Sequence, residues 1–279
     1  MTGHMLIFGM GYTASLLADA LRTDGWQVTG TRRMSGGDAI AFDDRSAVLT
    51  SIDSATHILS SVPPMAEGGD PVLTTYGNAI LRSGAKWTGY LSSTGVYGDA
   101  GGAWVDETAP IGQGRRSARS DADAAWQKLR ADVRVFRLPG IYGYGRSALD
   151  RVREGKAHRI DTPGQVFSRI HVDDIVSAVR ASFNSPAGVF NIADDLPCSQ
   201  NSVIEHACDL LGQTWPPVQS IEDAGLSPMA RGFYAENRRI SNQKAKRILN
   251  WQPTYSTYKQ GLTAIFAMEA KNPIDRDGT

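Results

Sequence analysis

Residues 92–121, SSTGVYGDAGGAWVDETAPIGQGRRSARSD, combine residue types in an order typical of a segment that forms the base of an active site. The stretch opens as a hydroxyl-rich strand end, continues through glycine and proline, and closes on a helix start. Proton transfer in such an active site needs a side chain that can give or take a proton near neutral pH. Between Gly98 and Ile141, however, there is no tyrosine and only one lysine, Lys128. The sequence therefore raises the question of which group would move a proton.

The composition argues against several classes of partner. Lysine plus arginine and aspartate plus glutamate both number 29, so the net charge is zero, with no electrostatic footprint for nucleic acid or an anionic membrane. Cys198 and Cys208 lie ten residues apart without a CxxC pattern, which predicts no metal site and fits a reducing compartment. No spanning or signal segment is visible. We expect a cytoplasmic protein that acts on a small molecule, and a homodimer is compatible with the sequence.

Short apolar runs alternate with helix-like stretches through the first half of the chain. Strands are predicted over 5–9, 26–32, 39–43, 57–62, 87–93 and 134–138, and helices over about 71–83 and 121–132. This alternation predicts an α/β fold, a Rossmann-type doubly wound parallel sheet with helices on both faces.

The pattern changes after Pro139, where a turn-rich segment and an amphipathic stretch precede a further helix and a strand over 188–193. We assign residues 1–168 to a dinucleotide-binding domain, with 171–193 returning to its sheet, and 194–279 to a smaller substrate-side lobe. Ligands of open α/β sheets bind at the carboxyl ends of the strands. The smaller lobe is therefore expected to close a cleft there.

The first ligand motif is GMGYTA, which starts at Gly9 between a predicted strand and a predicted helix. Gly9 permits a tight turn, and Gly11 lets the backbone approach a pyrophosphate. The helix start adds amide donors and the positive end of its dipole. The sequence predicts that this loop binds a dinucleotide, and the alternative is a glycine turn that binds nothing. The other loop residues expected to contact the cofactor are Met10, Tyr12 and Thr13.

The end of the second strand predicts which dinucleotide is preferred. NAD-binding folds usually hold the adenosine ribose with an acidic residue there, whereas this chain has Arg32 and Arg33. A guanidinium can clasp a 2′-phosphate by charge-assisted hydrogen bonds, so NADP is favoured over NAD. The alternative is a solvated arginine pair. Asp43, at the end of the third strand, either meets the adenine amino group or simply forms a turn.

Six motifs occur in order along the chain: GMGYTA, SSTGVYG, RLPGIYGYGRS, RIHVDDI, VFNIADDLP and RRISNQKAKRILNWQP. The set resembles the short-chain dehydrogenase/reductase superfamily, and most of all its extended branch of sugar-nucleotide epimerases and dehydratases, including the atypical members. The resemblance spans about residues 5–265. It implies NAD(P)-dependent oxidoreductase or epimerase chemistry on the predicted fold.

The resemblance also implies positions for the cofactor and the substrate. Ser93, four residues before the tyrosine of VYG, matches the serine or threonine that binds the substrate carbonyl. The segment that lies along the nicotinamide matches Pro139, Gly140 and Ile141. The strand end that passes the cofactor ribose matches Ser60, Ser61 and Val62.

The Tyr-xxx-Lys pair of the superfamily does not carry over. The matching stretch is RRSAR, with Arg115 in the place of the tyrosine and Arg119 in the place of the lysine. Arg119 keeps a positive charge for the cofactor ribose. Arg115 cannot act as an acid or base, because a guanidinium does not titrate in the working range. Tyr97, one turn beyond Ser93, is a candidate stand-in for proton transfer, and its alternative role is packing below the cleft. The other candidate stand-ins are Tyr142, Asp106 and Glu107.

Two classes of function stay open. The first is an NADP-dependent epimerase/dehydratase-like oxidoreductase that acts on a small carbonyl or sugar-type substrate with rearranged acid–base groups. The second is a non-catalytic NAD(P)-binding sensor or interaction protein. The predicted cleft and the carbonyl-binding Ser93 favour the first.

Many epimerases place a phosphate-binding arginine four residues before the histidine that is His171 here. In this chain Phe167 holds that position, and Arg169 lies only two residues before His171.

Overall fold

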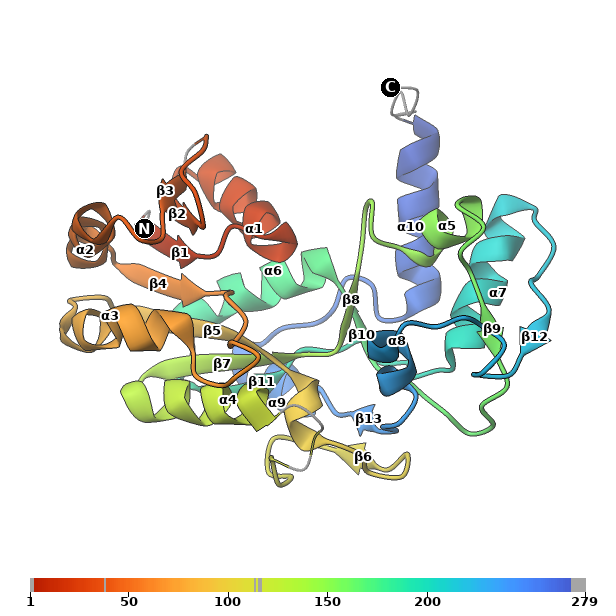
Figure 1. Ribbon diagram of the computed structural model, residues 1–279. Helices are drawn as coiled ribbons and strands as arrows, with labels where there is room; N and C mark the ends of the chain where they lie inside the picture. The colour runs from red at the N-terminus through yellow and green to blue at the C-terminus, as the bar shows by residue number, and fades with distance from the viewer. Residues whose placement is uncertain (1–2, 38, 113, 115–116, 272–279) are drawn as a thin grey trace.

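Seven parallel strands form the central sheet of the computed structural model, which describes residues 3–37, 39–112, 114 and 117–271 (Figure 1). Their spatial order is β11-β7-β5-β4-β1-β2-β3. The strands are β1 (His4–Phe8), β2 (Gln27–Arg32), β3 (Ala39–Ala41), β4 (His57–Ser60), β5 (Trp87–Ser93), β7 (Val133–Leu138) and β11 (Gly188–Asn191). The chain runs outward from β1 in both directions, so the switch point lies between β1 and β4. The predicted Rossmann-type sheet, including the returning strand at 188–191, is confirmed.

Helices cover both faces of the sheet, and β1 shows how the sequence achieves this. Met5 and Ile7 point into one core, and Leu6 and Phe8 point into another. Because successive side chains of a strand alternate between faces, a strand between two helical layers is apolar throughout. The first layer holds α1 (Tyr12–Thr23) and α6 (Val172–Ala181), and the second holds α2 (Arg45–Ser54), α3 (Pro71–Arg82) and α4 (Ser117–Leu129).

A second lobe lies beside the sheet, on the right of Figure 1. Its apolar core packs three helices together: α5 (Ala148–Arg153), α7 (Gln200–Leu211) and α10 (Tyr258–Lys271). The sequence sets the bounds of α7 locally. The hydroxyl of Ser199 accepts a hydrogen bond from the Ser202 amide at the start of the helix, and Gly212 ends it in the left-handed conformation with φ of 62°.

The two lobes do not divide the chain at one point. Helix α5 falls within residues 1–168, yet it packs against α7 and α10. Helix α9 (Gln243–Leu249) falls within residues 194–279, yet its Ala245 and Leu249 join the core around α1 and α6. The chain therefore crosses between the lobes more than once, and these crossings bring distant segments to the carboxyl ends of the strands.

Short elements complete the connection between the lobes. Strand pairs β8–β10, β9–β12 and β6–β13 are all parallel, and α8 packs near the first of them in Figure 1. Their bounds are β6 (Trp104–Val105), β8 (Gly140–Tyr142), β9 (Arg159–Ile160), β10 (Arg169–His171), β12 (Val218–Gln219), β13 (Arg239–Ile240), α8 (Pro228–Phe233), and the 3₁₀ turns η1 (Thr94–Tyr97) and η2 (Ser182–Asn184). Among the described helices, none combines the length and apolar character that a membrane span requires.

Candidate active site

The turn between β1 and α1 has a backbone conformation that favours glycine. Gly9 has a φ of 86°, and a Cβ built on it would lie 2.8 Å from Cγ2 of Val62, just after β4. Neighbouring strands hold the turn in place. The Met10 amide donates to the Thr31 carbonyl at 3.0 Å, and the Ser61 hydroxyl donates to the Gly9 carbonyl. Four residues predicted from the sequence thus meet at the switch point of the sheet.

The start of α1 offers an open set of amide donors. Gly11 is the N-cap residue, no side chain caps the helix there, and a Cβ built on Gly11 would meet no atom within 4 Å. The amides of Tyr12 and Thr13 belong to the first turn, where backbone donors lack intrahelical partners and the helix dipole is positive. This arrangement fits the pyrophosphate of a dinucleotide. Beside it, the hydroxyl of the fully buried Ser60 has no hydrogen-bond partner among the described residues.

Arg32 and Arg33 lie at the carboxyl end of β2, and both are exposed to solvent. Arg32 directly follows Thr31, whose carbonyl accepts the Met10 amide, so the arginine pair adjoins the glycine turn. Asp43, two residues after β3, is also exposed. The strand end therefore presents guanidinium groups at the edge where a dinucleotide would place its adenosine ribose.

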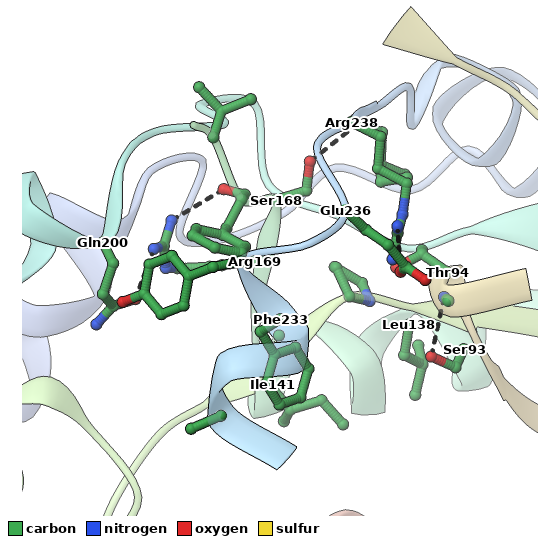
Figure 2. A pocket seen from close by; sticks show the side chains of 18 of the residues that line it. Ser93, Thr94, Leu138, Ile141, Ser168, Arg169, Gln200, Phe233, Glu236 and Arg238 are labelled. Carbon is green, nitrogen blue, oxygen red and sulfur yellow. Dashed lines mark hydrogen bonds and ion pairs between the residues drawn. The ribbon is translucent and has the colours of Figure 1, made fainter. Parts of the chain in front are cut away.

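A cavity of about 530 Å³ lies where β5 and β7 end and the second lobe begins (Figure 2). Its volume is within the range of small-molecule sites. The residues that the sequence predicted and that line this cavity are Ser93, Arg119, Pro139, Gly140 and Ile141. Among the described residues, no group of three or more side chains is placed to hold a metal ion.

Ser93 and Ser92 point in different directions because they are consecutive in a strand. The Ser92 hydroxyl is buried and donates to Asp123 on α4 at 2.6 Å. The Ser93 hydroxyl lines the cavity and accepts a hydrogen bond from the Gly95 amide at 3.1 Å. As an acceptor in that bond, the Ser93 hydroxyl keeps its proton to donate to a substrate oxygen.

Tyr12 and Arg146 connect the glycine turn to the cavity. The Tyr12 hydroxyl donates to the Tyr144 carbonyl at 3.0 Å, and the Arg146 guanidinium lies 5.7 Å from the centre of the Tyr12 ring. Arg146 also lines the cavity. Burial, aided by the charge of Asp173, raises the pKa of Tyr12 to about 12, so the phenol stays protonated and keeps this bond at neutral pH. Glycine turn and cavity are thus parts of one site.

Comparisons with known proteins define the fold family. No protein-family model matches this chain. A solved structure described as a functionally unknown conserved protein from Silicibacter pomeroyi DSS is 41% identical, with a TM-score of 0.89, and covers 96% of this chain and 99% of its own. At that identity over nearly the whole of both chains, the two proteins belong to one family. The 3-diazoavenalumate denitrifying reductase of a Streptomyces species is 27% identical over 299 residues, 93% of this chain and 95% of its own.

Structures of more distant proteins share the whole architecture. The human epimerase family protein SDR39U1 with NADPH has a TM-score of 0.76 at 15% identity and covers 95% of this chain and 99% of its own. MoeE5 in complex with UDP-glucuronic acid and NAD has a TM-score of 0.75 at 18% identity and covers 96% and 99%. This chain has the epimerase/dehydratase fold. The fold expected from the resemblance is confirmed.

The resemblance noted in the sequence places the proton-transfer tyrosine of the superfamily at the start of the helix that is α4 here. Arg115, which the sequence places at that position, lies outside the described residues. Arg119, in the first turn of α4, is half-buried and lines the cavity. The structure thus brings Arg119 and Ser93 to the same cavity.

Tyr97 lies in a buried network beneath the sheet end and does not line the cavity. It is 4% exposed, and its hydroxyl donates to Asn191 at 2.8 Å and accepts from Arg137 at 2.9 Å. Arg137 in turn forms an ion pair with Asp123 at 2.8 Å. Burial raises the pKa of the Tyr97 phenol. This geometry matches the packing role considered from the sequence and gives no support to a role as proton donor.

The cavity is rich in positive side chains that the sequence analysis did not identify as site residues. Its arginine, histidine and glutamate lining among the described residues is Arg119, Arg146, Arg151, Arg169, Arg238, His158 and Glu236. The Glu236 carboxylate accepts from Arg238 at 2.8 Å, and Arg238 also donates to the Gly98 carbonyl. Only Arg119 was given a site role by its motif. Arg146, Arg169 and Arg238 stand in three of the other motifs, which gave them no such role, and Arg151, His158 and Glu236 lie outside all six motifs.

Proposed function

We propose that this protein is an NADP-dependent oxidoreductase that reduces a small carbonyl compound. The observation that carries this proposal is the position of Ser93, which lines the cavity at the carboxyl end of β5 next to the segment from Pro139 to Ile141. In doubly wound sheets the dinucleotide lies across these strand ends. The reductase among the relatives supports reduction as the direction of the reaction.

The residues around the glycine turn fit this cofactor. Amides at the uncapped start of α1 bind the pyrophosphate, and Arg32 and Arg33 bind the 2′-phosphate that distinguishes NADP from NAD. β2 ends in arginine rather than in a carboxylate, which would repel that phosphate. The exposed Asp43 is placed beyond β3 for the adenine. NADPH, when bound, supplies the hydride that reaches the substrate carbon.

The protein's own contribution to the reaction is orientation and charge. Ser93 donates its hydroxyl proton in a hydrogen bond to the substrate oxygen, where negative charge develops in the transition state. Arg119 adds positive charge from α4. The proton that completes the reduction comes from water, because the Glu236 carboxylate of the same cavity is paired with Arg238. Because a well-placed acid contributes roughly 10²–10⁴-fold, we expect slow but measurable turnover if water supplies the proton.

The test is a screen of NADPH oxidation against aromatic and aliphatic aldehydes, ketones and sugar nucleotides. Any substrate found is then measured with Ser93→Ala and with a matched control, Ser46→Ala, on the exposed surface of α2. We expect activity to be lost in the first variant and kept in the second. Activity that survives unchanged in Ser93→Ala contradicts the proposal.

A second candidate is a protein that senses NADP(H) without turnover. One observation favours it: the hydroxyl of Tyr97 is engaged by Arg137 and Asn191 in the buried network, away from the cavity. The same screen separates the two candidates when calorimetry is added. Tight binding of NADPH with no oxidation by any compound of the panel supports the sensor.

A further inference from the structure

The end of the cavity that faces the second lobe has apolar and aromatic walls. Its apolar lining residues are Val166, Phe167, Ile204, Leu226, Phe233 and Tyr234. Phe233, the last residue of α8, is 57% exposed although it lines a cavity. A ligand with an apolar body would remove this aromatic surface from water, and that burial is favourable.

Two neutral polar groups on the same walls accept hydrogen bonds from the protein itself. The Ser168 hydroxyl accepts a hydrogen bond from the Ile240 amide at 2.9 Å, and the side-chain oxygen of Gln200 accepts one from Arg169 at 2.9 Å. A sugar ring needs partners for each of its hydroxyl groups, because a buried polar group without a partner costs free energy. Apolar side chains outnumber these neutral polar groups on the walls, which therefore suit an apolar body better than a sugar.

Arg169 is a buried cation whose hydrogen-bond partners are all neutral. It is 7% exposed, and its guanidinium donates to the carbonyls of Phe167 and Cys198 and to Gln200. Among the described residues, no carboxylate forms an ion pair with it. Asp194 is near enough to interact with its charge, but burial raises the pKa of that carboxyl to about 7, so it is only partly ionised at neutral pH. A buried charge of this kind is stabilised by an anion.

Arg151 also lines the cavity, whose carboxylate is already paired. Arg151 is exposed on α5, and His158 follows that helix. Glu236, the cavity's acidic residue among those described, is bonded to Arg238. In Figure 2, Arg169 and Gln200 lie at one end of the view and Ser93 at the other. The cavity thus combines the Ser93 hydroxyl toward one end, the buried charge of Arg169 toward the other, and aromatic walls.

We propose that the substrate is a carboxylic acid with a planar apolar body, whose carbonyl meets Ser93 and whose carboxylate meets Arg151 and Arg169. This proposal rests on the reductase function proposed above. The exposed Arg151 suits this role because its planar fork of donors matches the two oxygens of a carboxylate, and the buried Arg169, whose terminal nitrogens already donate to neutral partners, adds positive charge. The aromatic rings of Phe233 and Tyr234 pack against the body of the substrate.

The experiment compares three aldehydes that differ only in the group opposite the carbonyl. They are 4-formylbenzoate, its methyl ester and 4-formylphenyl phosphate, and kcat/KM is measured from NADPH oxidation. In parallel, terephthalate binding is measured by calorimetry on the protein saturated with NADP. Each measurement is repeated with Arg151→Gln and with the control Lys156→Gln, which removes an exposed charge beside α5 that does not line the cavity.

We expect the acid to be used at least tenfold better than its ester, and Arg151→Gln to remove that preference by lowering kcat/KM for the acid. The control keeps the preference. Equal kcat/KM values for the acid and the ester overturn the carboxylate site but leave the reductase standing, and a preference for the phosphate overturns the choice of carboxylate. Terephthalate binding that Arg151→Gln abolishes, without turnover of any aldehyde, keeps the anion site and rejects the reductase. Absence of both binding and turnover rejects both proposals.

Discussion

The glycine turn and the end of the cavity that faces the second lobe, called here the substrate end, are built from the sequence in different ways. The turn is contiguous, since Gly9, Gly11 and the start of α1 follow one another directly after β1. The substrate end joins side chains from α5, β10 and the segment around α8, which are separated by dozens of residues. A contiguous motif can be read from its own spacing, whereas side chains that meet across a cavity carry no local signal. The class of cofactor is therefore readable from the sequence, and the class of substrate requires the structure.

Removal of the Ser93 hydroxyl should have the largest effect on activity. Ser93→Ala takes away the donor to the developing oxyanion, and loss of one such donor costs roughly 10²–10³-fold in kcat. Steady-state kinetics should show this loss mainly in kcat, with NADPH affinity unchanged. A fall in NADPH affinity of the same size would instead show that Ser93 binds the cofactor, so that its role would not be confined to the substrate.

Replacing Arg32 and Arg33 with alanine tests which cofactor the protein prefers. The double variant should bind NADPH at least tenfold more weakly, because a hydrogen bond to a charged group contributes roughly 1.5–3 kcal/mol. NADH binding should barely change. Titration calorimetry measures both, with Arg45→Ala on α2 as a control for lost surface charge. Equal losses for the two cofactors would mean that the arginine pair does not bind the 2′-phosphate.

Gly9→Ala tests whether the turn needs a residue without Cβ. A φ of 86° is strained for alanine by roughly 1–2 kcal/mol, and the new Cβ would meet Val62. We expect weaker binding of both cofactors and a lower midpoint of thermal unfolding. Gly37→Ala, which has a φ of 55° but no atom within 4 Å of a new Cβ, is the matched control for strain alone. Identical behaviour of the two variants would show that the contact with Val62 is unimportant.

Substitution of Tyr97 should have the smallest effect on the rate of the reaction. Tyr97→Phe leaves a buried Arg137 donor without its acceptor, so the free energy of unfolding should fall by roughly 1–3 kcal/mol. The pH–rate profile should keep its shape, because burial raises the pKa of this phenol and its hydroxyl is directed to Asn191 and Arg137. Disappearance of an ionisation from the profile would assign the proton to Tyr97 after all.

The strands of the central sheet and the residues of the glycine turn could be predicted because each depends on a short run of sequence. Met5 to Phe8 are all apolar, and this run alone indicates a strand covered on both faces. Helices α2 and α10 were not predicted. The core-facing residues of α2 are only Val48 and Ile52, so its apolar stripe is short, and α10 follows a segment of turns.

The substrate end could not be predicted for a different physical reason. Arg169 was noted only for its distance from His171, and nothing in its neighbourhood indicates that it is buried with neutral partners. Phe233 lies in a segment that reads as loop, and its position at the cavity depends on how the second lobe folds back on the sheet. Tyr97 was equally ambiguous, since one sequence pattern fits both a phenol in the cleft and a phenol below it.

The most direct test of the account is the transfer of label from NADPH deuterated at C4 of the nicotinamide. Cofactor labelled on one face or the other is incubated with 4-formylbenzoate, and the deuterium in the alcohol product is measured by mass spectrometry. The account predicts transfer from one face only, and loss of transfer in Ser93→Ala while NADPH still binds. An alcohol without label, or no alcohol from any carbonyl compound of the panel despite bound NADPH, would contradict it.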